Sequence, residues 1–146
     1  MVKIKNFIDT PSQTAGPFLH IGCTPSITGI KIFKDELGST PFKNISLYEE
    51  INIKGKIYDG NNDPIIDAMI ETWQCDENGK YYNYQGFSRR VTDFKTGEYQ
   101  LKTIRPGNQT NEDGTISPSY ILFWIVARGM NLSLIHISEP TRLEPI

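Results

Sequence analysis

The sequence of 146 residues has little of what disulfide frameworks, secretion and membrane spans require. Its two cysteines, Cys23 and Cys75, are too few for a disulfide framework, and we expect both to be reduced thiols. No apolar run approaches the length of a membrane-spanning helix, about 18 residues, and the N-terminus lacks the apolar core of a secretory signal. We therefore expect a cytoplasmic protein.

The net charge is small, and the basic residues are not clustered. The formal net charge is −2, and the lysines and arginines are scattered along the chain. Binding to a phosphate backbone requires a basic cluster, so nucleic acid is excluded as a partner. With 38% hydrophobic residues, a chain of this length has room for one ordinary globular core.

Signals for β-strands begin after a long irregular segment. Residues 1–50 are assigned to an N-terminal arm and loop, because they are rich in Pro, Gly, Ser and Thr without a sustained period. We expect the order of this arm to depend on a partner surface. From Ile51, isoleucines alternate with polar residues, which predicts a half-buried strand. The turn-forming run Asp59–Pro64 and an apolar strand over Ile65–Gln74 then predict a hairpin.

Two further strands complete the predicted core. Alternation at Tyr99, Leu101 and Thr103 indicates one strand, which ends before Pro106. The run Tyr120–Ala127 is almost continuously apolar and is typical of a strand buried on both faces at the centre of a core. Short strands joined by turns, without an amphipathic helix or a repeat, predict an all-β fold, an incomplete β-sandwich over residues 51–131.

Residues 132–146 have a different character. The segment LSLIHISEPTRLEPI closely resembles a translated sequencing-library adapter. We therefore interpret this tail as an artefact and exclude it from the prediction of the fold. The alternative is a genuine C-terminal strand and tail. On the first interpretation we expect the natural protein to continue past Asn131. The chain of 146 residues is then expected to be poorly stable, because its sandwich is incomplete.

A metal site built by this chain alone is hard to assemble. Outside the tail the sequence has one histidine, His20, followed by Cys23, whereas stable sites need three or four converging ligands. We expect this pair to be structural. The run Asp59–Asp63 resembles the start of a calcium loop, but Pro64 stands at the required glycine and Ile70 at the required glutamate. It is interpreted as a turn.

The sequence also offers no self-contained catalytic machinery. No Gly-rich phosphate loop, Gly-x-Ser-x-Gly elbow or Cys–His nucleophile pairing is present. The cluster Tyr81, Tyr82 and Tyr84 can supply a phenolate ligand or a substrate contact. Alternatively, these tyrosines pack at the edge of the sandwich with their hydroxyls in water.

Three stretches carry a resemblance to a known family. They are TPSQTAGPF (10–18), GKIYDGNNDPIIDAMIETWQCDENGKY (55–81) and TGEYQLKTIRPG (96–107), the last followed by ARGMN (127–131). In this order they resemble the alpha subunits of the intradiol ring-cleaving dioxygenases. The middle block is shared across that family, while the opening stretch and the ARGMN ending point to alpha.

The resemblance implies paired alpha and beta subunits, each a β-sandwich, with ferric iron held in the beta subunit by two tyrosines and two histidines. Such enzymes cleave a catechol between its hydroxylated carbons with dioxygen. Against the beta pattern, the first tyrosine ligand corresponds to Tyr81, the second falls at Gln109, and the histidines fall at Tyr120 and Leu122. An arginine of that pattern corresponds to Ser117. The resemblance therefore implies that Fe(3+) belongs to the partner and not to this chain.

The resemblance also implies substrate-binding residues that line the pocket over the iron of the beta subunit. These are Thr14, Ala15, Gly16, Pro17 and Phe18 of the arm, together with Arg128. The guanidinium of Arg128 can pair with a substrate carboxylate or with beta, because its fork suits planar anions. Its other interpretation is a surface residue after a buried strand. Many relatives have tyrosine where this chain has Phe18.

Two other functions are kept as alternatives. A noncatalytic transthyretin-like or carboxypeptidase-regulatory-like binding module shares the hairpin and the TGEYQLKTIRPG pattern, but it has no need of the TPSQTAGP arm. A self-sufficient catechol dioxygenase is opposed by the missing histidines.

Overall fold

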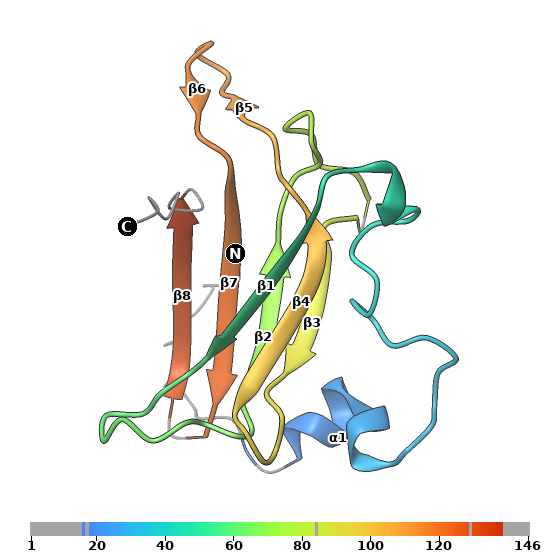
Figure 1. Cartoon of the computed structure of the whole chain (residues 1–146), viewed down its shortest axis with the longest axis vertical. Helices are drawn as coiled ribbons and strands as arrows, with labels where there is room; N and C mark the ends of the chain where they lie inside the picture. Colours follow the sequence, from blue (N-terminus) through green and yellow to red (C-terminus); the bar gives the residue numbers. More distant parts are fainter. Residues whose placement is uncertain (1–15, 17, 84, 129, 139–146) are drawn as a thin grey trace, which may run out of the picture.

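Two antiparallel sheets pack face to face in the computed structural model, which describes residues 16, 18–83, 85–128 and 130–138. One sheet pairs β1 (Glu50–Lys56) with β4 (Glu98–Ile104), and the other has the order β3-β2-β7-β8. The strands of the second sheet are β2 (Met69–Trp73), β3 (Phe87–Val91), β7 (Tyr120–Ala127) and β8 (Met130–Ser138). Figure 1 shows β1 and β4 crossing over β7, β2 and β3, with β8 beyond them. The predicted all-β sandwich is confirmed.

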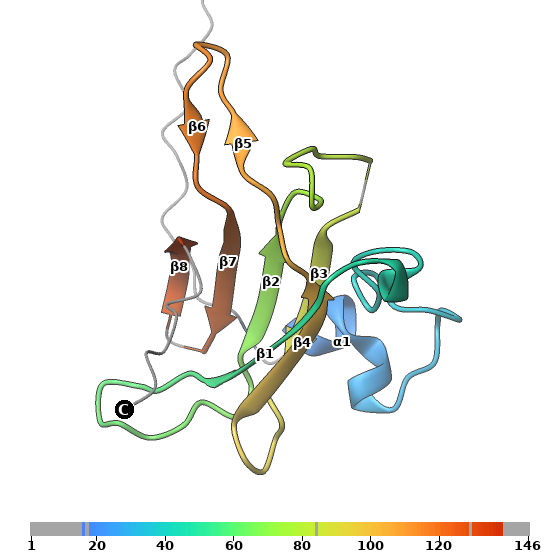
Figure 2. The ribbon, with the colours of Figure 1, turned by 45° about the horizontal axis from the view of Figure 1, so that its top comes forward.

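The remaining elements are short. A ribbon of β5 (Gln109–Thr110) and β6 (Ile116–Ser117) extends beyond the end of β7, as Figure 2 also shows. The arm contains α1 (Leu19–Cys23) and two 3-10 helices, η1 (Pro25–Thr28) and η2 (Ile45–Leu47). Among the described residues, no helix combines the length and the apolarity that crossing a bilayer requires.

The core lies between the inward faces of the two sheets. Ile70 of β2 and Phe123 of β7 are 1% and 2% exposed, and they belong to a cluster of buried apolar side chains. Ile51 and Ile53 of β1 pack against this cluster, and β1 alternates between exposed and half-buried residues as predicted. Burial of such side chains stabilises the fold by about 1.5–3 kcal/mol each.

The predicted hairpin between the first two strands is wrong. β1 pairs with β4 in register Ile53↔Leu101, while β2 pairs with β3 and β7 in the other sheet. The intervening segment makes an isolated bridge between Tyr58 and Pro64, and β2 begins at Met69 rather than at residue 65. The two strands bury their apolar faces against each other across the sandwich instead of pairing edge to edge.

The turn between these strands is as predicted. The Asp59 carboxylate accepts hydrogen bonds from the backbone N–H groups of Asn61 and Asp63, both at 2.9 Å. A carboxylate that satisfies nearby backbone donors in this way is the usual signature of an Asx turn.

The bounds of β7 match the predicted strand, but its burial on both faces does not. Phe123 and Ile125 face the core, whereas Trp124 on the opposite face is 42% exposed. The two-stranded sheet covers one face of β7, and the other face remains accessible at Trp124.

The arm is held on its own chain. The Arg89 Nη1 of β3 donates to the Cys23 carbonyl at 2.9 Å, and the Arg90 Nη1 donates to the Gly38 carbonyl at 2.8 Å. Phe42 is 3% exposed. Residues 23–42 thus contact β3 at these points, while Ile32, Phe33 and Leu37 are 62–64% exposed. The expected dependence of the arm on a partner surface stays a prediction.

The last described strand overlaps the predicted tail. β8 pairs antiparallel with β7, with Ile121 opposite Ile137 in the register. The proposed division at residues 50/51 and 131/132 stays a prediction, as does the interpretation of 132–146 as an adapter-derived tail.

Candidate functional site

Three positions that match iron ligands of the beta pattern come together in the structure. Tyr81 follows the turn after β2, Gln109 begins β5, and Tyr120 begins β7. The Gln109 Nε2 donates to the Tyr81 hydroxyl at 3.2 Å, and the Tyr120 hydroxyl donates to the Gln109 Oε1 at 3.3 Å. The Tyr81 and Tyr120 hydroxyls are 3.5 Å apart. Leu122 lies two residues along β7, so it shares a face of the strand with Tyr120.

These side chains do not fit a ferric centre. Burial raises the pKa of the Tyr81 phenol, and the hydrogen bond with Tyr120 raises it further, although the Gln109 contact lowers it. The donor atoms decide whether this set fits Fe(3+), because a bound cation would itself lower the pKa of a phenol. Gln109 offers a neutral amide and Leu122 offers no donor atom. In the described part of the chain, no group of three or more His, Cys, Asp or Glu side chains converges on a possible metal site.

Tyr81 and Tyr82, two tyrosines of the cluster noted in the sequence, have different environments in the structure. The Tyr81 ring stacks on Trp73 with centroids 5.8 Å apart and an interplanar angle of 7°. Tyr82 is 52% exposed, as expected for a tyrosine at the edge of a sandwich, and Tyr84 lies outside the described residues. Tyr81 is therefore the member of the cluster with a defined environment, and its match to an iron ligand stays a prediction.

The predicted substrate-binding residues are partly brought together at the other end of the sheet. Gly16 and Arg128 line one pocket of about 260 Å³. Phe18 is 75% exposed and is absent from the described lining, while Thr14, Ala15 and Pro17 lie outside the described residues.

The walls of this pocket are apolar and its polar groups are few. Leu19, His20, Ile66, Asp67 and Phe94 complete the lining. The Arg128 Nε lies 2.5 Å from the Asp67 Oδ2. The His20 Nε2 lies 3.0 Å from the Asp67 carbonyl oxygen, and the His20 ring meets Phe94 edge to face at 5.8 Å. The pocket therefore places an arginine, paired with a carboxylate, beside apolar side chains.

The two clusters lie at opposite ends of β7. Tyr120 begins this strand of eight residues and Arg128 directly follows its last residue. At about 3.3 Å per residue the two positions are roughly 25 Å apart. Within one chain, therefore, Arg128 cannot contact a small molecule bound at the Tyr81 end.

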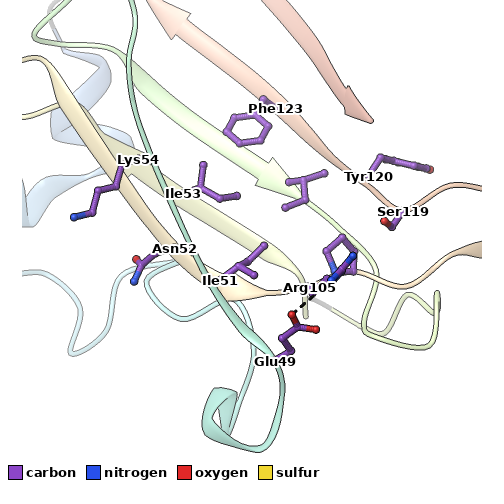
Figure 3. Close-up of a pocket in the computed structure, with 11 residues that line it drawn as sticks. Glu49, Ile51, Asn52, Ile53, Lys54, Arg105, Ser119, Tyr120 and Phe123 are labelled. Atoms are coloured by element: carbon purple, nitrogen blue, oxygen red, sulfur yellow. Dashed lines mark ion pairs between the residues drawn. The ribbon is translucent and has the colours of Figure 1, made fainter. Parts of the chain in front are cut away.

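A larger groove belongs to the interior of the sandwich. It has a volume of about 560 Å³ and lies between the inward faces of β1 and β7, where Ile51, Ile53 and Phe123 form its walls (Figure 3). The Arg105–Glu49 ion pair, 3.6 Å between Nη1 and Oε1, lies at its rim. Core side chains form its walls, and polar side chains, among them Lys54, Ser119 and Tyr120, also line it.

Sequence reasoning missed Asp67 as a member of the site. The residue lies inside the stretch predicted as an apolar strand, and its side chain is 19% exposed. A carboxylate within an apolar run was the available signal, since a half-buried charge needs a partner.

Gly16 provides a prediction that separates a structural from a functional role. A Cβ at this position would meet no atom of the described residues within 4 Å. We therefore expect Gly16→Ala to leave the melting temperature within about 1–2 °C, as for other substitutions without steric conflict. If a ligand or a second chain approaches this backbone closely, the same variant weakens that contact. Thermal melts and binding measurements check both; a large loss of stability would contradict the prediction.

Comparisons with known proteins agree with the sequence resemblance. A family described as "Dioxygenase" matches residues 33–130. The chain is 37% identical over 133 residues to the protocatechuate 3,4-dioxygenase alpha chain of Pseudomonas putida, covering 86% of this chain and 66% of that one. It is 29% identical over 91 residues to the protocatechuate 3,4-dioxygenase beta chain of Burkholderia cepacia, covering 53% and 38% respectively. The chain thus spans at most about two thirds of these curated relatives.

Solved structures share the fold. The 3-chlorocatechol 1,2-dioxygenase of Rhodococcus opacus 1CP superposes with a TM-score of 0.62 at 18% identity, over 68% of this chain and 47% of that one. The dioxygenase domain of a carbohydrate-binding fusion protein from Streptomyces sp. SirexAA-E gives 0.62 at 16% identity, over 90% and 77%. The family match and the curated relatives do not favour a transthyretin-like binding module. From its sequence and its fold, the chain belongs to the intradiol dioxygenase family.

Proposed function

We propose that this chain is the alpha subunit of a cytoplasmic protocatechuate 3,4-dioxygenase and acts only with a beta subunit that holds Fe(3+). The assembled enzyme converts protocatechuate to 3-carboxy-cis,cis-muconate. The bond between the two hydroxylated ring carbons breaks, and both atoms of dioxygen enter the product. The names of the alpha and beta relatives support this reading.

The observation that carries the proposal is the separation of the two clusters along β7. By the resemblance, the Tyr81 cluster corresponds to the iron ligands of a beta subunit, and Arg128 follows the far end of the strand. When two related subunits associate about a pseudo-twofold axis, opposite ends of the two folds can meet. Arg128 of this chain then serves the iron-containing pocket of its partner.

In this arrangement the iron bound by beta would supply the activation of the catechol toward dioxygen, and the present chain contributes binding and orientation. Arg128 receives the carboxylate of protocatechuate in a charge-assisted, planar pair. Gly16, in the same pocket, lets the backbone approach the ligand without a side chain intervening. Thr14, Pro17 and Phe18 are proposed to belong to the same wall.

Co-expression with a beta chain tests the proposal. We expect the purified alpha–beta complex to consume dioxygen with protocatechuate, and to contain about one iron per pair because one of its two sandwiches has the ligand set. Oxygen uptake and metal analysis measure both. A mixture no more active than the beta chain alone would count against the proposal, and so would stoichiometric iron with turnover in this chain purified by itself.

A further inference from the structure

We infer that Asp67 is a positioning residue that holds the Arg128 guanidinium in the orientation needed to receive the carboxylate of an aromatic substrate. The inference rests on the proposed function and adds a residue that neither the sequence pattern nor the family resemblance singled out.

The contact itself selects one edge of the guanidinium. The Asp67 Oδ2 lies 2.5 Å from the Arg128 Nε. A guanidinium has a side edge that includes Nε and an end edge formed by its two Nη nitrogens. Pairing at Nε restricts the rotation of the group and does not use the end edge, which is the edge that a second planar carboxylate can take in a bidentate pair.

Exposure shows which partner fixes the other. The Arg128 side chain is 68% exposed, whereas the Asp67 side chain is 19% exposed. A long exposed arginine loses considerable rotamer entropy when it is ordered, so a fixed partner lowers the cost of ligand binding. The direction of control therefore runs from Asp67 to Arg128.

The backbone of Asp67 is itself anchored on two sides. The His20 Nε2 lies 3.0 Å from the Asp67 carbonyl, and because a carbonyl only accepts, this nitrogen carries the proton. The next residue, Ala68, is fully buried, and its N–H donates to the Thr92 hydroxyl at 3.0 Å. The Thr92 N–H donates back to the Ala68 carbonyl, also at 3.0 Å. Asp67 is thus attached to both α1 and the end of β3.

Charge repulsion and positioning predict opposite effects of removing the Asp67 carboxylate on substrate binding, so an experiment can distinguish them. Asp67 is a carboxylate beside the place proposed for another carboxylate, so its charge repels the substrate. If that repulsion dominated, removal of the charge would tighten binding. If orientation dominates, removal weakens binding, because Arg128 then samples many rotamers.

The test compares variants in the assembled alpha–beta complex with two substrates. Protocatechuate carries a carboxylate, and catechol does not. We expect Asp67→Ala to raise KM for protocatechuate about tenfold, the size of one coupling between neighbouring charged groups. The value of kcat and the KM for catechol should change less than about twofold. Asp67→Glu should restore most of the loss, because it can still reach Nε, and Asp67→Asn should fall between the two.

A double-variant cycle with Arg128→Ala separates the inference from the proposed function. We expect Asp67→Ala to add nothing once Arg128 is absent, since it acts through that residue. A normal or lower KM for Asp67→Ala while Arg128→Ala is impaired overturns the positioning role alone. Equal losses for protocatechuate and catechol likewise indicate a structural role and overturn it. If Arg128→Ala itself binds protocatechuate as the parent enzyme does, the proposed role of Arg128 fails as well.

Discussion

Arg128→Ala in the assembled enzyme is expected to raise KM for protocatechuate by about 10- to 100-fold, since a hydrogen bond to a charged group contributes about 1.5–3 kcal/mol. The side chain follows the end of β7 and lines the same pocket as Gly16. If the carboxylate stays bound in the transition state, kcat changes little, because the lost interaction is the same in the ground state and the transition state. Steady-state kinetics by oxygen uptake measures both constants.

Two comparisons make this result specific. Catechol lacks the carboxylate, so its KM should be almost unaffected by Arg128→Ala. Arg105→Ala removes another exposed arginine, whose ion pair with Glu49 is 3.6 Å long, and should leave both substrates unchanged. Arg128→Lys keeps the charge without the planar fork and should be intermediate. A loss of subunit association in Arg128→Ala, with normal kinetics in whatever complex remains, would instead indicate that Arg128 pairs with beta.

The strands that could be predicted are those whose signal is local. The bounds of β7 were predicted correctly from the run Tyr120–Ala127. A run of eight apolar residues is too short for most helices and is typical of a buried strand. β3 was missed because its sequence, FSRRV, places two arginines side by side and hides the alternation. In the structure one of them, Arg89, is paired with Glu71 across the sheet, which a local pattern does not reveal.

The pairing of strands was not predictable from the turn between them. The run Asp59–Pro64 does form a turn, yet β1 and β2 lie in different sheets. Turn residues predict that the chain reverses direction. They do not predict whether the two flanking strands then pair by hydrogen bonds in one sheet or pack their apolar faces together from two sheets. That choice depends on β4 and β7, which are distant in sequence.

In the candidate site, too, residue positions could be predicted from the sequence, but their contacts could not. The family pattern indicated which positions replace the iron ligands, and Tyr81, Gln109 and Tyr120 do meet in the structure. Their mutual hydrogen bonds could not be predicted, because Tyr81 lies in a loop while Gln109 and Tyr120 begin two different strands. Asp67 was missed for a related reason: its partner Arg128 is 61 positions away along the chain, and only the fold brings the two together.

The Glu71–Arg89 pair supports the second large prediction, which concerns stability. The Arg89 Nε and Nη2 donate to the Glu71 Oε1 at 2.7 and 2.5 Å, and the side chains are 17% and 8% exposed for Arg89 and Glu71. Arg89→Met leaves the Glu71 carboxylate buried without this partner, which costs about 3–5 kcal/mol. For a domain of this size we expect the melting temperature to fall by about 10 °C.

The variant should also release the arm, since the Arg89 Nη1 holds the Cys23 carbonyl. Limited proteolysis of the alpha–beta complex should therefore cut near residue 23 faster in Arg89→Met. Arg105→Met is the matched control, because the exposed Arg105–Glu49 pair contributes at most about 1 kcal/mol. The double variant Glu71→Leu/Arg89→Met should recover part of the melting temperature without restoring protection of the arm, because it removes the unpaired charge but not the lost hydrogen bond. Equal melting temperatures for Arg89→Met and Arg105→Met would show that the buried pair does not hold β2 and β3 together.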